Sequence, residues 1–293
     1  MRPLCIYHGG CDDGFGSAFV VHSFFAGDVD FHYGVYQQDP PDVSGRDVVI
    51  TDFSYERAVL ERMANEARSI VVLDHHKSAA EDLAAFAVHE SRPGTLVWDD
   101  VPRLLRELNE RNRPPLIAVF DMERSGAGIT WDFFFGPRPR PWLIDYIEDR
   151  DLWRRALPHS DEITMALSSY PHDFETWQRI VDAGADALVA DGRAIHRYHR
   201  TIVDALKRNA TRAVIGGVDV PVVNAPPQFA SEVAGELAEG EPFAACYWNH
   251  PRGTTYSLRS RKGGMDVSEI AKLYGGGGHR AAAGFTVEAP LSV

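Results

Sequence analysis

The sequence predicts an α/β fold with a larger, parallel-sheet N-terminal domain, helices on both faces of that sheet, and a smaller α/β C-terminal domain. Three observations lead to this prediction. Short apolar runs alternate with helical patterns in the first half of the chain. The 293 residues exceed a typical single domain. A long helical pattern separates two groups of motifs, so we expect domains over residues 1–184 and 212–293, joined by a linker helix over 185–211.

The first domain alternates strands with helices. Residues 70–73 are four successive apolar residues, as in a strand buried on both faces of a parallel sheet. Strands are expected near 3–8, 31–36, 47–52, 69–74 and 116–121, and helices near 14–26, 55–67, 78–87, 127–135, 140–148, 160–168 and 172–183. Residues 88–115, with a helical stretch at 101–111, interrupt this alternation. We interpret them as a surface insertion, with a lid or a homodimer contact as the alternatives.

The second domain has a similar pattern of shorter elements. Strands are expected at 213–216, 220–224, 243–249 and 254–260, and helices at 229–239 and 266–274. A run of four glycines, Gly275–Gly278, follows the last helix. Glycines permit positive φ angles and close backbone approach, so their N–H groups can form a concavity that binds anions.

Four expected strands end on a histidine or an aspartate. LCIYH, VVITD, IVVLD and IAVFD end on His8, Asp52, Asp74 and Asp121. Ligands of open α/β sheets gather beyond the carboxyl ends of the strands. We interpret Asp121 as the cap of the following helix, because Ser125 and a helical pattern come soon after it. The other strand ends indicate a functional site.

The remaining polar residues predict a metal site. Converging aspartates and histidines commonly bind ions, and the predicted ligands are His8, Asp13, Asp52 and His75. Imidazole and carboxylate donors without a thiolate cluster suit Mn²⁺ first, with Mg²⁺, Co²⁺ or Fe²⁺ as alternatives. A structural zinc site is disfavoured.

Composition limits the setting. The net charge of −12 argues against an extended nucleic-acid-binding surface, because phosphate neutralisation is the main source of that affinity. A short substrate is therefore expected. No apolar run is long enough to cross a membrane and the first residues do not read as a signal peptide. Three widely spaced cysteines, Cys5, Cys11 and Cys246, favour a reducing cytoplasm.

The chain also resembles a known family. It carries, in this order, HGGCDDGFGSA, TD at 51–52, LDHH at 73–76, YIEDRDLW at 146–153 and GGGGHRAAAGF at 275–285. These strings resemble the successive motifs of the DHH phosphoesterases with a C-terminal DHH-associated domain, and they cover nearly the whole chain. The resemblance implies a two-metal phosphohydrolase. Members of the family include single-strand exonucleases, oligoribonucleases, cyclic-dinucleotide phosphodiesterases and relatives that hydrolyse pyrophosphate or polyphosphate.

The resemblance also implies roles for individual residues. The implied ligands of two Mn²⁺ ions are His8, Asp13, Asp52, His75 and Asp149, with Mg²⁺ or Co²⁺ as alternatives. Asp52 bridges both ions, and Asp151 is the alternative to Asp149. The implied catalytic residues are Asp52, His76 and Asp74: His76 contacts the substrate phosphate, and Asp74 orients a neighbouring histidine.

One position departs from the family pattern. The first motif of the family commonly carries two aspartates separated by one residue, and Cys11 stands at the first of these positions. Four interpretations are open. Asp12 takes over the role, water replaces the missing ligand, Cys11 binds metal as a thiolate, or Cys11 is an inert small residue.

The second domain is expected to hold the substrate. With the DHH-run histidine included, the predicted substrate-binding residues are His76, Arg259, Gly277, Gly278, His279 and Arg280. The predicted function is hydrolysis of short single-stranded oligonucleotides or dinucleotides to mononucleotides in the cleft between the two domains. The alternatives are pyrophosphate or polyphosphate hydrolysis, and a nucleotide-binding protein without turnover.

Overall fold

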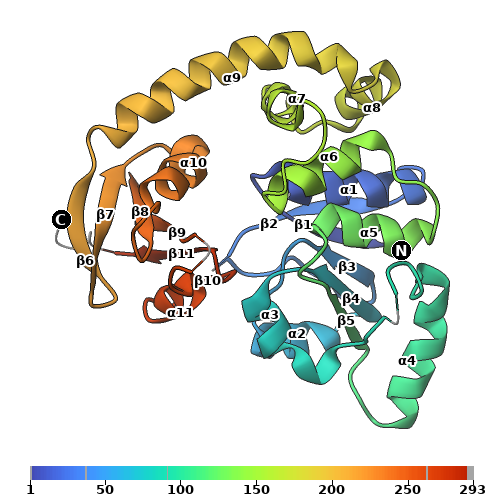
Figure 1. Cartoon of the computed structure of the whole chain (residues 1–293). Helices are drawn as coiled ribbons and strands as arrows, with labels where there is room; N and C mark the ends of the chain where they lie inside the picture. Colours follow the sequence, from blue (N-terminus) through green and yellow to red (C-terminus); the bar gives the residue numbers. More distant parts are fainter. Residues whose placement is uncertain (1, 37, 91, 262, 289–293) are drawn as a thin grey trace. The chain divides into compact units, whose positions relative to one another are not determined.

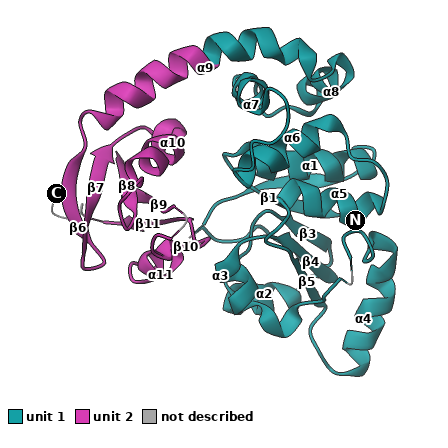
Figure 2. Ribbon diagram, viewed as in Figure 1, with its two compact units in different colours: residues 1–195 teal, residues 196–293 magenta. Residues whose placement is uncertain are grey.

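The computed structural model describes residues 2–36, 38–90, 92–261 and 263–288. The chain forms two compact units, residues 1–195 and 196–293, and the boundary between them lies within helix α9 (Asp186–Lys207) (Figure 2). The predicted division of roles between residues 1–184 and 212–293 stays a prediction. No helix in the described part of the chain is long and apolar enough to cross a membrane.

Unit 1 is built on a parallel sheet with the strand order β2-β1-β3-β4-β5 (Figure 1). The strands are β1 (Leu4–His8), β2 (Asp30–Gly34), β3 (Asp47–Thr51), β4 (Ser69–Asp74) and β5 (Leu116–Phe120). The predicted parallel sheet is confirmed. Each predicted strand agrees with the observed one to within two residues.

Successive residues of these strands enter two different hydrophobic cores. Cys5, Val49 and Val71 face the core beneath helices α1 (Asp12–Phe24) and α5 (Gly126–Phe135). Their neighbours Ile6, Val48 and Val72 face the opposite core, beneath α2 (Arg57–Ala64). The sheet is therefore buried on both faces, which explains why its strands are apolar without alternation.

Further helices complete unit 1. They are α3 (Lys77–Asp82), α4 (Val101–Glu110), α6 (Trp142–Asp151), α7 (Ser160–Leu167) and α8 (Phe174–Ala183), with short 3₁₀ turns η1 (Ala84–Phe86) and η2 (Trp98–Asp100). The predicted insertion, 88–115, contains η2 and α4. Its Leu104, Leu105 and Leu108 pack against the core that also holds α1 and α5. The insertion is thus anchored to the domain core through one apolar face.

The strand register aligns the polar strand ends in one row. Tyr7 pairs with Thr51, and Thr51 pairs with Leu73. His8, Asp52 and Asp74 therefore follow at the same level along three adjacent strands. β1 lies between β2 and β3, so the chain crosses to opposite sides of β1, and such a switch in strand order opens a crevice at the carboxyl ends.

Unit 2 is a second, mixed sheet with the order β10-β11-β9-β8-β7-β6. Its elements are β6 (Thr211–Ile215), β7 (Val218–Asn224), α10 (Pro227–Leu237), β8 (Ala244–His250), β9 (Gly253–Arg259), α11 (Val267–Lys272), β10 (Gly277–Gly278) and β11 (Ala282–Val287). β7 and β8 are parallel, and the other neighbours are antiparallel. The sequence did not indicate β10 and β11, because the glycine-rich and alanine-rich segments have weak strand propensity.

Candidate metal centre and active site

Asp52 lies at the centre of the predicted site. It follows β3 directly and its side chain is 2% exposed. Asp52 is a member of three groups of potential metal donors. Its partners in them are His8 with Cys11, Asp13 with His75, and Asp74 with His76. Within each group the donor atoms lie within 4.8 Å of one another. The structure therefore brings residues from three strand ends and helix α1 to a single carboxylate.

The two oxygens of Asp52 contact two different histidines. Oδ2 lies 3.3 Å from Nδ1 of His8, and Oδ1 lies 3.1 Å from Nε2 of His75. A carboxylate that presents one oxygen to each side has the geometry of a bridging ligand for two cations. Asp52 adopts this position with a left-handed backbone, φ 53, which an aspartate tolerates better than most side chains.

Asp13 is fixed by the N-terminus of α5. Its Oδ2 accepts the N–H of Gly126 at 2.7 Å, and its Oδ1 accepts the N–H of Ala127 at 2.9 Å. Unpaired N–H groups at a helix start favour a carboxylate. The same Oδ2 lies 3.7 Å from Nε2 of His75. The orientation of Asp13 toward the cluster thus depends on where α5 begins.

Glu148 binds the same helix start. Its Oε2 accepts the N–H of Ser125 at 3.1 Å and lies 3.0 Å from Nη1 of Arg140. Asp121, which we expected to be a helix cap, instead accepts Glu123 N–H at 2.8 Å. The N-cap is Ser125, whose Oγ accepts the N–H of Gly128.

The structure favours Asp151 over Asp149 as a member of the cluster. Oδ2 of Asp151 lies 3.6 Å from Nε2 of His75. Both oxygens of Asp149 are directed elsewhere, because they accept the backbone N–H groups of Ala156 at 2.9 Å and Leu157 at 3.3 Å. Asp149 therefore holds the turn after α6. The structure does not bring Asp149 to the predicted ligands, whereas it brings Asp151 to His75.

Cys11 lies within the cluster, and Asp12 does not. Sγ of Cys11 lies 3.5 Å from both Nδ1 of His8 and Oδ2 of Asp52. It also accepts the N–H of Gly14 as the N-cap of α1. Asp12 accepts a hydrogen bond from Ser168 at 2.7 Å and lies 3.0 Å from the ring of His172. The interpretation in which Asp12 replaces the missing aspartate does not fit this geometry.

Asp74 and His76 form a separate pair at the edge of the cluster. Asp74 is fully buried, and its Oδ1 lies 2.7 Å from Nδ1 of His76. The same oxygen accepts the N–H of His75 at 2.7 Å. The contact of the Asp74 carboxylate with Nδ1 fixes the orientation of the His76 ring. Nε2 is then the ring nitrogen that can contact a ligand. This contact fits the orienting role expected for Asp74.

The electrostatics of the cluster favour a positive charge at its centre. Burial acts to lower the pKa of His75, but Asp52, Asp151 and Asp13 outweigh it and raise that pKa well above its usual value. Burial acts to raise the pKa of Asp52, but His75 and His8 outweigh it and hold that pKa well below its usual range. A bound divalent cation would supply the positive charge that the three carboxylates attract. Hard oxygen and imidazole donors fit Mn²⁺ or Mg²⁺.

The predicted substrate residues of unit 2 gather around the β10–β11 turn. Arg259, the last residue of β9, pairs with Ala282 of β11. Its guanidinium donates to Ser231 Oγ at 2.6 Å and to the carbonyl of Leu258 at 2.8 Å. The N–H of His279 donates to the carbonyl of Ala282 at 2.7 Å, which closes the turn.

The glycine run has a packing role at two of its four positions. A Cβ at Gly276 would lie 2.1 Å from the carbonyl oxygen of Gly284, and one at Gly278 would lie 2.6 Å from that of Ala282. The N–H groups of Gly275 and Gly276 donate to carbonyls of α11. They are not available to the expected anion-binding concavity. Gly277 and Gly278 form β10, which pairs with β11, and Arg280, next to His279, is exposed and donates to Gly264 O at 3.2 Å.

Comparison with known proteins gives one curated relative and several related folds. No family model matches the chain. Uncharacterized protein R106 of Acanthamoeba polyphaga mimivirus is 29% identical over 311 residues, which cover 96% of this chain and 66% of that protein. The chain thus spans slightly less than two thirds of the length of this relative.

Among solved structures, RecJ from Thermus thermophilus in complex with Mn²⁺ matches with a TM-score of 0.51 and 15% identity, over 98% of this chain and 49% of RecJ. The pGpG-specific phosphodiesterase PggH from Vibrio cholerae gives a TM-score of 0.45 and 13% identity, over 98% of this chain and 94% of that chain. The fold assignment rests on RecJ. This chain therefore has the fold of the DHH-family proteins, to which RecJ belongs.

Proposed function

We propose that this protein is a DHH-family phosphoric ester hydrolase that uses two divalent cations, Mn²⁺ first, to cleave phosphodiester bonds in short oligonucleotides or dinucleotides. The observation that carries the proposal is the shared position of Asp52 between His8 and His75. The proposed ligands are His8, Asp13, Asp52, His75 and Asp151. The likeness to RecJ supports the fold that places them, and the motif order supports the reaction class.

The cations would supply a hydroxide nucleophile at neutral pH and neutralise charge on the phosphoryl group. The residues of the chain then have distinct tasks. Asp52 would hold both cations, because its two oxygens face His8 and His75. Asp13 is kept in place by the start of α5, and Asp74 holds the ring of His76. When its ring carries a proton on each nitrogen, His76 can donate from Nε2 to a phosphate oxygen and so stabilise the charge that develops there. No protein nucleophile is required.

Unit 2 would bind the nucleotide beside the scissile bond, through His279, Arg259 and the Gly277–Gly278 segment. Support comes from the C-terminal motif and from the position of these residues around one turn. The site between the two units and the cytoplasmic location stay predictions. The decisive experiment is to incubate the purified protein and Mn²⁺ with a labelled linear dinucleotide, longer single strands and polyphosphate. Phosphate release from polyphosphate with every nucleotide intact would overturn the proposed substrate.

A second candidate function is nucleotide binding without turnover. The position of Cys11, where the family commonly has an aspartate, is the observation that favours it. Metal analysis and turnover separate the two functions. Two Mn²⁺ per chain with dinucleotide cleavage would exclude the second candidate. Tight dinucleotide binding with no cleavage across Mn²⁺, Mg²⁺ and Co²⁺ would exclude the first.

A further inference from the structure

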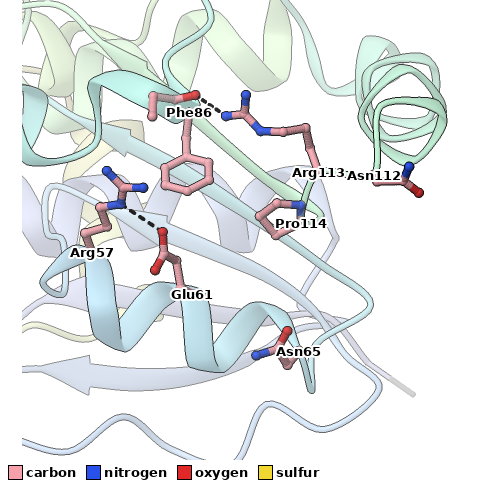
Figure 3. A pocket seen from close by; sticks show the side chains of 8 residues that line it. Arg57, Glu61, Asn65, Phe86, Asn112, Arg113 and Pro114 are labelled. Atoms are coloured by element: carbon pink, nitrogen blue, oxygen red, sulfur yellow. Dashed lines mark hydrogen bonds and ion pairs between the residues drawn. The ribbon is translucent and has the colours of Figure 1, made fainter.

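Unit 1 carries a pocket that shares no residue with the candidate metal centre. It has a volume of about 650 Å³ and is lined by Arg57, Glu61, Asn65, Ala85, Phe86, Asn112, Arg113 and Pro114 (Figure 3). These residues belong to α2, η1 and the segment that leads into β5, the edge strand of the sheet. Nothing in the proposed hydrolysis uses them.

Two arginines of this pocket lie over the same aromatic ring. The guanidinium carbon of Arg57 is 5.5 Å from the centre of the Phe86 ring, and that of Arg113 is 5.6 Å from it. The ring is held in place, because Phe86 is 6% exposed and packs in the core beneath α2. Contact with an aromatic face restricts a long cationic side chain. The two guanidinium groups are thus each held against the Phe86 ring, which lies between them in Figure 3.

Both guanidinium groups have donors beyond their structural hydrogen bonds. Nε of Arg57 donates to Glu61 Oε1 at 2.8 Å, and Nη2 of Arg113 donates to the carbonyl oxygen of Ala85. These are the hydrogen bonds that the two side chains make to the described residues. A guanidinium carries five N–H donors, so several stay available to a ligand in the pocket.

The charge and shape of the lining select an anion. Two arginines against one glutamate give a positive balance in a chain whose net charge is −12. Asn65 and Asn112 also belong to the lining of this pocket. The planar fork of an arginine matches the oxygens of a phosphate in a bidentate manner. Phosphate oxygens can therefore satisfy the free donors of either fork.

We propose that this pocket binds a phosphate group, with Arg57 and Arg113 as the recognising residues and Phe86 as the platform that orients them. Phosphate is the chemistry shared by the backbone of a single-stranded nucleic acid and by free pyrophosphate. Glu61 competes with the ligand for Arg57, so it tunes the affinity downward. Phosphate binding at this pocket does not depend on hydrolysis at the metal centre.

Binding is measured on the full chain in EDTA, so that failure of the hydrolytic function does not affect the result. The probes are a short fluorescently labelled single-stranded oligonucleotide and, separately, pyrophosphate by calorimetry. Arg57→Ala and Arg113→Ala should each weaken binding roughly tenfold. For the oligonucleotide, each should also reduce the slope of log affinity against log salt by about 0.7, the value for one phosphate contact on a single strand.

Two matched variants complete the test. Glu61→Gln should strengthen binding, because it removes the competing carboxylate. Arg62→Ala, on the same helix, should change nothing, because Arg62 donates to the carbonyl of Ala58 and does not line the pocket. If binding of the oligonucleotide depends on the two arginines, the ligand is a nucleic-acid backbone. If only pyrophosphate binds in this way, the ligand is a free anion. Equal affinities for Arg57→Ala, Arg113→Ala and Arg62→Ala, or weaker binding by Glu61→Gln, would overturn the proposal.

Discussion

The backbone of Gly126 lies so close to Asp52 that a Cβ on Gly126 would be 2.4 Å from the Cβ of Asp52. The same glycine donates its N–H to Asp13 at 2.7 Å. Helix α5 can therefore begin beside the cluster only with a residue that has no side chain. This contact links the placement of two proposed metal ligands to one glycine.

We expect Gly126→Ala to displace the start of α5. The added methyl group should reduce the free energy of unfolding by about 1–3 kcal/mol, as overpacking commonly does, and it should weaken Mn²⁺ binding because Asp13 and Asp52 move apart. Urea denaturation and calorimetry with Mn²⁺ measure the two effects. Gly217→Ala is the control for Mn²⁺ affinity alone: it lies in unit 2 and no atom lies within 4 Å of a Cβ there, but its φ of +81 means that this alanine also costs stability. Unchanged Mn²⁺ affinity in Gly126→Ala would contradict the prediction.

Asp149 and Asp151 should respond to substitution in different ways. Asp151→Asn should weaken Mn²⁺ binding by roughly tenfold or more and leave the melting temperature of the metal-free protein nearly unchanged. Asp149→Asn should lower the free energy of unfolding by about 1 kcal/mol, because it weakens hydrogen bonds to Ala156 and Leu157. Calorimetry and thermal unfolding of both variants give the comparison. The reverse pattern would restore Asp149 as the ligand.

Mn²⁺ should stabilise the folded protein. A ligand that binds only the folded state at one hundred times its dissociation constant adds about 2.7 kcal/mol to the free energy of unfolding. Differential scanning calorimetry at increasing Mn²⁺ should therefore show a rising melting temperature. Asp52→Asn should remove most of this rise, because Asp52 belongs to three of the four groups of potential metal donors among the described residues. A full rise in that variant would mean that Mn²⁺ binds elsewhere.

Cys11 should affect which metal binds. If its sulfur is a ligand, Cys11→Ser should lower the affinity for Cd²⁺ far more than that for Mn²⁺, because thiolates prefer soft ions. Burial and nearby carboxylates raise the pKa of the Cys11 thiol well above its usual value, so a cation is needed to form the thiolate at neutral pH. The Cd²⁺–thiolate absorption band reports the bond directly. Equal losses for both metals would show that Cys11 is only the helix cap.

Unit 2 should lose stability in acid through Glu236. Arg200 and Lys207 of α9 lower the pKa of Glu236 from 4.5 to about 2, although burial opposes this shift. A depressed carboxyl pKa adds stability that is present above pH 4.5 and is lost as the pH falls toward 2. Because the pair is partly exposed, we expect about 1 kcal/mol. Urea unfolding of Glu236→Gln should differ from wild type by this amount at pH 7 and by less at pH 3. Glu239→Gln is the control, because Glu239 is exposed. Its free energy of unfolding should equal that of the wild type at both pH values.

Local patterns in the sequence were sufficient to predict the sheet of unit 1 and the residues at its strand ends. Runs such as IVVLD specify both a buried strand and the point where it ends. The hydrogen bond from Gly126 to Asp13 joins residues 113 positions apart, and no local pattern encodes such a contact. The choice between Asp149 and Asp151 depends on how the turn after α6 closes, which the acidic helix pattern does not determine. A signal for α5 was present in SGAG at 125–128, a small-residue helix start that allows close approach.

The left-handed backbone at Asp52 has a practical consequence for work with this protein. Aspartate and asparagine are among the few residues that adopt this conformation readily. Exchange of Asp52 for asparagine therefore removes the central charge while the chain keeps its path at the end of β3. Bulkier β-branched residues would distort that path. We therefore expect Asp52→Asn to be an inactive form that can capture an uncleaved substrate, and the captured molecule would identify what the protein acts on in its native extract.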